Sequence, residues 1–184
     1  MNRLIASLTA LVLFAGVAIA ADSSKSGLAV GDGVAAFHVK DVTGPSAGKS
    51  LCYRCEYGGN PTACVFTREI TPEVAALVAS IDKTVGENKG KGMKAFVVLL
   101  TDDAEGGAKK LAEVAKDKGI KNVPLTLYDG KTGPDAYKIS KDAAVTVLLW
   151  NKSKVAANHG FTEAKISEEG QKAVVAAANK MVGG

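Results

Sequence analysis

The sequence predicts one α/β domain with a central mixed sheet and flanking helices, and three stretches carry that prediction. Residues 95–101, AFVVLLT, form an unbroken apolar run typical of a strand buried on both faces of a parallel sheet. Thr71 and Pro72 open an amphipathic segment as the N-cap and first residue of a helix. Residues 145–159 are typical of a strand, a tight turn and a returning strand. Together these stretches predict strands that alternate with crossover helices.

The remaining elements are predicted from the spacing of apolar residues and from residues that form helix caps and turns. Strands are expected at 34–39 and 62–67, on either side of a glycine-rich loop. The helix after Thr71 has one apolar face, made of Val74, Leu77, Val78, Ile81 and Val85. Further along we expect a helix at 105–118 capped by Asp102 or Asp103 and ended by Gly119, a strand at 123–127, a helical turn within 133–139 and a last helix capped by Ser167. The predicted order is β-β-α-β-α-β-α-β-β-α.

The N-terminus has the pattern of a secretory signal peptide. Arg3 precedes an apolar run from Leu4 to Ile19, and small residues around Ala20 suit cleavage there. A retained anchor helix is the alternative interpretation of the same run. We therefore expect a signal peptide at 1–20, a flexible tether at 21–31 and one domain at 32–184, exported to the periplasm or secreted and free of the membrane after cleavage.

Composition and charge exclude several classes of partner. The apolar content of 47% is that of a globular protein, and loss of Arg3 with the leader leaves 22 basic against 19 acidic side chains. The basic residues are mostly lysines scattered among acids, so no nucleic-acid partner is expected. The stretch 44–50, GPSAGKS, resembles a phosphate loop, but Thr43 stands where that loop needs its first glycine. No nucleotide or other cofactor is predicted, and the oligomeric state is left open.

Three stretches resemble members of the thioredoxin-like superfamily, in the peroxiredoxin and TlpA-type group. Residues 35–44, AAFHVKDVTG, resemble the opening x-F-x-L-x-D-x-x-G of that group, and residues 123–129 with 136–139 resemble its F-P-L-L-x-D…A-Y-x-V. Residues 145–155 resemble the hairpin that follows. The resemblance implies a thioredoxin-like fold with an N-terminal strand extension. It also implies a catalytic cysteine at the start of the first long helix, with a cis-proline beside it.

The chain departs from this group at both of those positions. Residues 68–74, REITPEV, contain no cysteine, and Ala143-Ala-Val-Thr146 stands where the group has x-I/V-P-T. Pro124 lies one strand too early to take that role. The inherited active site is therefore predicted to be lost, and a conventional peroxidase is not expected.

A C-x-x-C pair, Cys52 and Cys55, lies instead ahead of the second strand. In an exported protein such a pair is oxidised by default. Three interpretations stay open. The bridge is a structural staple, or it is a redox disulfide in which Cys52 attacks, Cys55 resolves and Arg54 stabilises the thiolate, or the thiols bind a metal.

The third cysteine and the two histidines complete the set of candidates. Cys64 lies in a predicted core strand and is expected to be a free, buried thiol, with a bridge to Cys52 or Cys55 as the alternative. His38 and His159 are weak candidates for a metal site with the three cysteines. The sequence favours a non-enzymatic binding or scaffold module. A thiol–disulfide oxidoreductase is the alternative, a thiolate metal protein comes third, and the partner would be another exported thiol or disulfide protein.

Overall fold

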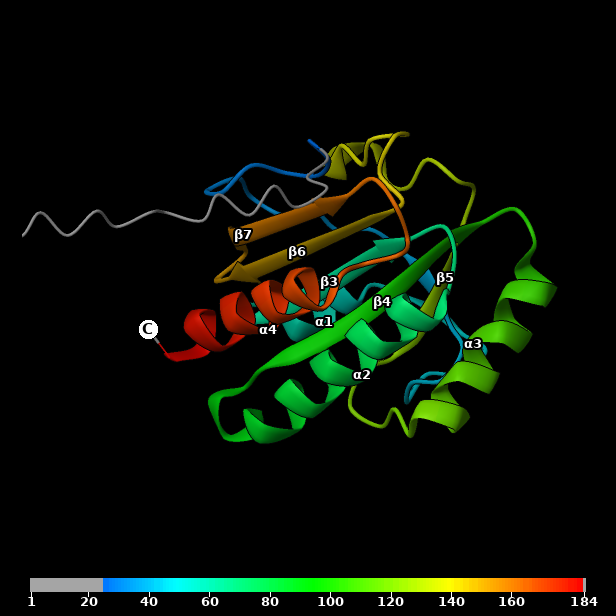
Figure 1. Ribbon diagram of the computed structural model, residues 1–184, viewed down its shortest axis with the longest axis horizontal. Helices are drawn as coiled ribbons and strands as arrows, with labels where there is room; N and C mark the ends of the chain where they lie inside the picture. Colours follow the sequence, from blue (N-terminus) through cyan, green and yellow to red (C-terminus); the bar gives the residue numbers. More distant parts are fainter. Residues whose placement is uncertain (1–24, 184) are drawn as a thin grey trace, which may run out of the picture.

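The fold is that of a computed structural model, which describes residues 25–183. A seven-stranded sheet runs through the molecule in the order β2-β1-β5-β4-β3-β6-β7 (Figure 1). The strands are β1 (Val39–Asp41), β2 (Ser50–Leu51), β3 (Thr62–Thr67), β4 (Lys94–Thr101), β5 (Leu125–Asp129), β6 (Val145–Asn151) and β7 (Lys154–Phe161). The helices are α1 (Tyr53–Tyr57), α2 (Pro72–Glu87), α3 (Ala104–Lys118) and α4 (Glu168–Gly183), with single 3-10 turns η1 (Lys89–Lys91) and η2 (Asp135–Tyr137).

The sheet is mixed because some of its neighbouring strands are parallel and others are antiparallel. β3, β4 and β5 are parallel neighbours joined by α2 and α3, as consecutive parallel strands require. β6 lies antiparallel to β3, pairing Thr67 with Val145, and β7 returns beside β6 through a two-residue turn. Lys152 and Ser153 at that turn have φ of 49° and 62°. This topology is the predicted α/β class with a mixed sheet.

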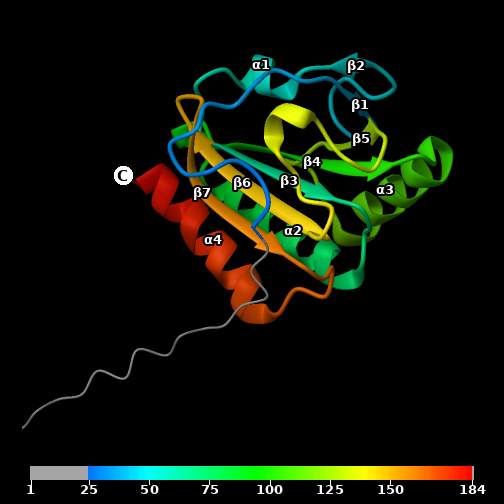
Figure 2. The same cartoon turned by 90° about the horizontal axis from the view of Figure 1, so that it is seen from above.

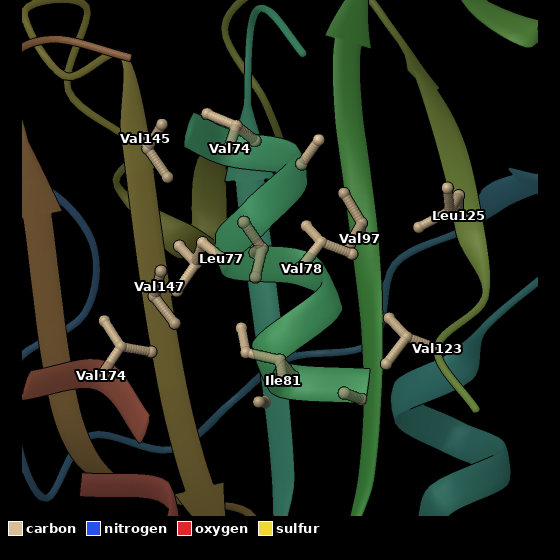
Figure 3. Packing of buried hydrophobic residues seen from close by; sticks show 14 of the residues in the cluster. Val74, Leu77, Val78, Ile81, Val97, Val123, Leu125, Val145, Val147 and Val174 are labelled. Carbon is tan, nitrogen blue, oxygen red and sulfur yellow. The ribbon is translucent and has the colours of Figure 1, made fainter. Parts of the chain in front are cut away.

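One face of the sheet packs against α2, α3 and α4. Val74, Leu77, Val78 and Ile81 of α2 point at valines of β4 and β6, and Val174 of α4 joins them from the side (Figure 3). All five side chains are buried. The predicted apolar face of α2 therefore supplies the larger core cluster.

The other face is covered by irregular chain and short elements in place of long helices. Figure 2 shows α1 on the side of the sheet opposite α2 and α4. This second cluster is rich in rings and contains Phe37, Tyr53, Phe66, Phe96, Tyr137 and Trp150. Aromatic side chains bury a large area each, so a thin layer of chain is enough to close this face. The layer positions the cysteine pair.

Most predicted elements are confirmed, with two corrections at the N-terminal side. The strand expected at 34–39 begins only at Val39, because Val34 and Phe37 turn into the aromatic cluster and Val34 pairs singly with Ser153. The pair expected to lie in a loop opens the five-residue α1. Both differences arise from contacts with distant residues, which local pattern does not contain.

The segment expected to be a tether also differs in its described part, residues 25–31. Ser26 and Leu28 are buried, and the Ser26 hydroxyl lies 2.6 Å from that of Thr146. Asn158 Nδ2 donates to the carbonyl oxygens of Ser26 and Leu28 at 2.7 and 2.8 Å. This segment is therefore part of the domain. The leader expected at 1–20, with residues 21–24, lies outside the described residues.

Candidate functional site

The cysteine pair is a disulfide at the start of α1. Cys52 and Cys55 are bridged, with their Cα atoms 5.2 Å apart. Cys52 is the N-cap residue of the helix, and its Sγ accepts the backbone N–H of Cys55 at 3.1 Å. Gly58 ends the helix at φ 57°, a conformation that favours glycine. The predicted pairing is therefore the one that the structure has, and Cys64 is the free thiol.

The two sulfur-bearing residues differ in their access to solvent. Tyr53 and Tyr57 are one helical turn apart and point into the aromatic cluster, with ring centroids 5.2 Å from each other. Cys55 lies midway between them in sequence and therefore on the opposite face of α1, where it is exposed. Cys52 is only 7% exposed. The more accessible residue of the pair is therefore Cys55.

A buried aspartate holds the loop that leads to the disulfide. Asp41, 1% exposed, accepts the backbone N–H groups of Gly44 and Ser46, each at 2.8 Å. The Tyr53 hydroxyl donates to Asp41 Oδ2, also at 2.8 Å. A carboxylate with three donors is well satisfied away from water. Tyr53, which follows Cys52 directly, is thus fixed to the sheet at its hydroxyl end.

Sequence reasoning missed Asp41 as a residue of this site, and it assigned Tyr53 and Tyr57 to an apolar docking surface of the loop, whereas the Tyr53 ring is buried and its hydroxyl is bonded to Asp41. The signal that could have found the aspartate is local, because an Asp at a strand end followed by Gly and Ser within five residues is typical of side-chain to backbone turn bonding. No local signal joins Asp41 to Tyr53, since the two are twelve residues apart. Their hydrogen bond and burial raise the pKa of Tyr53 above the ordinary tyrosine range, burial being the larger cause.

Arg54, the predicted thiolate stabiliser, is used elsewhere. Its Nε–H donates to the carbonyl oxygen of Val34 at 3.1 Å. This bond ties α1 to the N-terminal segment. The side chain therefore has a structural contact, and the donor to Cys52 Sγ is a backbone N–H.

The opposite end of β3 is where the resemblance places a catalytic cysteine. A six-residue strand is about 20 Å long, so α1 and the N-terminus of α2 lie at opposite ends of the sheet. Thr71 caps α2 there, accepting the Val74 N–H at 3.2 Å, and its hydroxyl donates to Ala164 O at 2.8 Å. The disulfide therefore lies away from the inherited position, as its place in the sequence predicts.

Arg68 lies between β3 and α2, close to the start of that helix. Its guanidinium donates to the carbonyl oxygens of Lys131 at 2.9 Å, Ser140 at 3.1 Å and Ala143. Partial burial lowers the pKa of Arg68. This cation therefore ties the β3–α2 junction to the segments that follow β5 and precede β6.

The candidate metal ligands do not meet. Cys64 is fully buried in β3, and burial raises the pKa of its thiol. His159 lies on β7, where burial lowers its pKa, and His38 lies just before β1 at the other side of the sheet. In residues 25–183 no three His, Cys, Asp or Glu side chains come together as a metal site. The structure thus separates the residues of the third interpretation.

Known proteins resemble this chain in fold. No protein-family model matches it, and no curated protein does. A putative thiol:disulfide interchange protein DsbE from Chlorobium tepidum superposes with a TM-score of 0.64 at 15% identity, over 84% of this chain and 99% of the other. A putative protein disulfide isomerase from Bacteroides thetaiotaomicron gives 0.66 at 16%, over 86% and 94%. Peroxidoxin BcpB from Mycobacterium tuberculosis gives 0.58 at 16%, over 82% and 96%. The chain therefore has the thioredoxin-like fold.

Proposed function

We propose that this thioredoxin-fold protein exchanges electrons with thiols of other exported proteins through the Cys52–Cys55 disulfide. The observation that carries the proposal is a disulfide in which one residue, Cys55, is exposed, on a helix anchored to the sheet independently of the bridge. Tyr53 and Asp41 provide that anchor, and Arg54 adds a second contact. A redox centre needs such support, because the loop must keep its shape when the disulfide opens.

The scaffold interpretation assigns the bridge a stabilising role only. In the chain-entropy view a disulfide stabilises by closing a loop of the unfolded chain, and the gain grows with loop length. This bridge spans a sequence separation of 3. So short a loop gives a gain of about 2 kcal/mol, near the low end of the range for disulfides. The geometry therefore favours exchange over the scaffold role that the sequence alone favoured.

Export is part of the proposal and is supported by the leader pattern in residues 1–20. None of the helices in residues 25–183 is both long and apolar enough to cross a bilayer. Two proteins with this fold are a putative thiol:disulfide interchange protein from Chlorobium tepidum and a thiol:disulfide interchange protein from a Bacteroides species, which agrees with the proposed chemistry. An oxidising compartment would supply the disulfide form that starts the reaction.

The deciding experiment is a redox titration of the mature protein, residues 21–184. The protein is equilibrated in glutathione and dithiothreitol buffers, quenched with acid and alkylated, and the fraction of modified Cys55 is measured by mass spectrometry. An exchanging disulfide is expected between about −120 and −270 mV, whereas a structural one lies below about −300 mV. A potential below about −300 mV, together with no reduction of insulin, would contradict the exchange function and favour the scaffold interpretation.

A Cys64→Ala variant serves as the background for this titration. Cys64 is buried and unpaired, so the substitution removes the third thiol without touching the disulfide. The same titration on Arg54→Ala tests the stabiliser role that the sequence assigned to that residue. Because the Arg54 Nε–H is committed to Val34, we expect its removal to shift the potential by only a few tens of millivolts, equivalent to about 1 kcal/mol.

A further inference from the structure

The two sulfurs of the disulfide have unequal surroundings, which sets the direction of any exchange. Cys55 is exposed on the outer face of α1, whereas Cys52 is 7% exposed and lies at the junction of β2 and α1. A thiolate attacks a disulfide in line, approaching one sulfur from the side away from the other. A thiolate from solvent therefore has better access to the exposed Cys55 than to the buried Cys52.

The leaving group also differs between the two directions. When the bridge opens by attack on Cys55, the electron pair leaves on Cys52 Sγ, which already accepts the Cys55 N–H at 3.1 Å. A hydrogen bond to the charged form of a group favours that form. Burial of Cys52 opposes a charge there, and this N–H donor offsets part of that penalty. Tyr53 holds the neighbouring backbone, so the donor stays in place as the bond breaks.

We infer that Cys55 is the sulfur that contacts the substrate and Cys52 is the leaving and resolving thiol, the reverse of the order that the sequence suggested. The substrate is a reduced dithiol on another exported protein, and the inference rests on the proposed function. The roles follow from access and from the N–H donor, and Arg54 has no part in them.

The step balances as a two-electron exchange. One thiolate of the substrate attacks Cys55 Sγ, a bond forms between those sulfurs, and the Cys52–Cys55 bond breaks. Cys52 Sγ leaves as a thiolate and takes a proton from solvent. The second substrate thiolate then attacks the substrate sulfur of the mixed disulfide and releases Cys55. The substrate dithiol is oxidised to a disulfide, and the protein disulfide is reduced to two thiols.

The test traps the first step with a monothiol, which has no second thiol of its own to resolve the mixed disulfide, so that resolution must wait for another molecule. Oxidised mature protein in the Cys64→Ala background is mixed with reduced glutathione, quenched in acid within seconds, alkylated and mapped by mass spectrometry. We expect glutathione on Cys55 and the alkyl label on Cys52. Glutathione on Cys52 with the label on Cys55 would overturn the assigned order and leave the proposed function standing.

Single-cysteine variants provide an independent reading that does not depend on the bridge. Cys52→Ser leaves Cys55 as the sole thiol of the pair, and Cys55→Ser leaves Cys52. The first variant should react with an aromatic disulfide reagent at least about tenfold faster than the second, since access limits the buried thiol. Equal rates would contradict the assignment.

One outcome of the glutathione experiment would contradict both the inference and the proposed function. It is the absence of a mixed disulfide at either sulfur in the folded wild-type protein, when the denatured protein forms one.

Discussion

Replacement of Tyr53 by Phe tests the claim that the disulfide loop is held by a buried hydrogen bond. The substitution removes one oxygen, whose hydrogen donates to Asp41 Oδ2 at 2.8 Å, and leaves the ring in the aromatic cluster. Asp41 then keeps two backbone donors in place of three. A hydrogen bond to a charged group is worth about 1.5–3 kcal/mol, so we expect the free energy of unfolding to fall by about 2 kcal/mol.

The assay is urea denaturation followed by the fluorescence of Trp150, the one tryptophan of the chain, which is fully buried. A loss of about 2 kcal/mol corresponds to a decrease in Tm of about 4–8 °C for a domain of this size. Tyr57→Phe is the matched control. The Tyr57 hydroxyl donates to Ala95 O at 3.4 Å from a half-buried position, so its removal should cost less than about 1 kcal/mol.

The same measurement on reduced protein separates the two supports of the loop. Opening the bridge should lower the free energy of unfolding by about 2 kcal/mol. Because Tyr53 anchors α1 without the bridge, the effects of reduction and of Tyr53→Phe should add to within about 0.5 kcal/mol. A coupling above about 1 kcal/mol, or loss of the fold on reduction of the wild-type protein, would refute the reasoning.

Four further outcomes follow from the same contacts. Arg68→Ala should lower the free energy of unfolding, measured by urea denaturation, by about 2 kcal/mol. Arg68→Lys should not restore this stability, because an ammonium group does not span three carbonyl oxygens. Full rescue by lysine would contradict the role assigned to the guanidinium. Stopped-flow assays should find no rapid consumption of hydrogen peroxide by the reduced protein, since Thr71 and not a cysteine caps α2, and fast turnover would mean that the peroxide site has been rebuilt elsewhere. Burial is the main cause that raises the pKa values of Tyr53, Tyr57 and Tyr137. Their contribution to the stability of the folded state is therefore present below pH 10 and is lost as the pH rises. The phenolate absorbance of these three residues should appear only with alkaline unfolding, and its appearance in folded protein would be inconsistent with burial. Burial lowers the pKa of His159, so its contribution to stability is present above pH 6.5 and is lost as the pH falls. His159→Gln should therefore make the free energy of unfolding less dependent on pH between pH 7 and 5. An unchanged pH dependence would argue against this role of His159.

Local pattern was enough for the long elements of this fold. The N-caps Thr71 and Asp103, the glycine after α3 and the apolar run of β4 each depend on neighbours within one or two turns. The place of the cysteine pair ahead of β3 was equally local. It predicted the disulfide at the far end of the strand from α2, because the loop that carries it enters β3 at the end opposite to the one from which α2 follows, unless that loop folds back along the sheet.

The tertiary structure alone decided which partners individual side chains contact. Asp41 meets Tyr53, Arg54 meets Val34, and Arg68 reaches Ala143 across 75 residues of sequence. The exposure of Cys55 over Cys52 follows from the way the two tyrosines orient α1 on the sheet. The sequence alone determined the α/β class, the absence of a cysteine at the start of α2 and the presence of a C-x-x-C pair ahead of β3. Only the folded chain decided which cysteine is exposed, because a five-residue helix takes its orientation from the surface on which it packs and not from its own period.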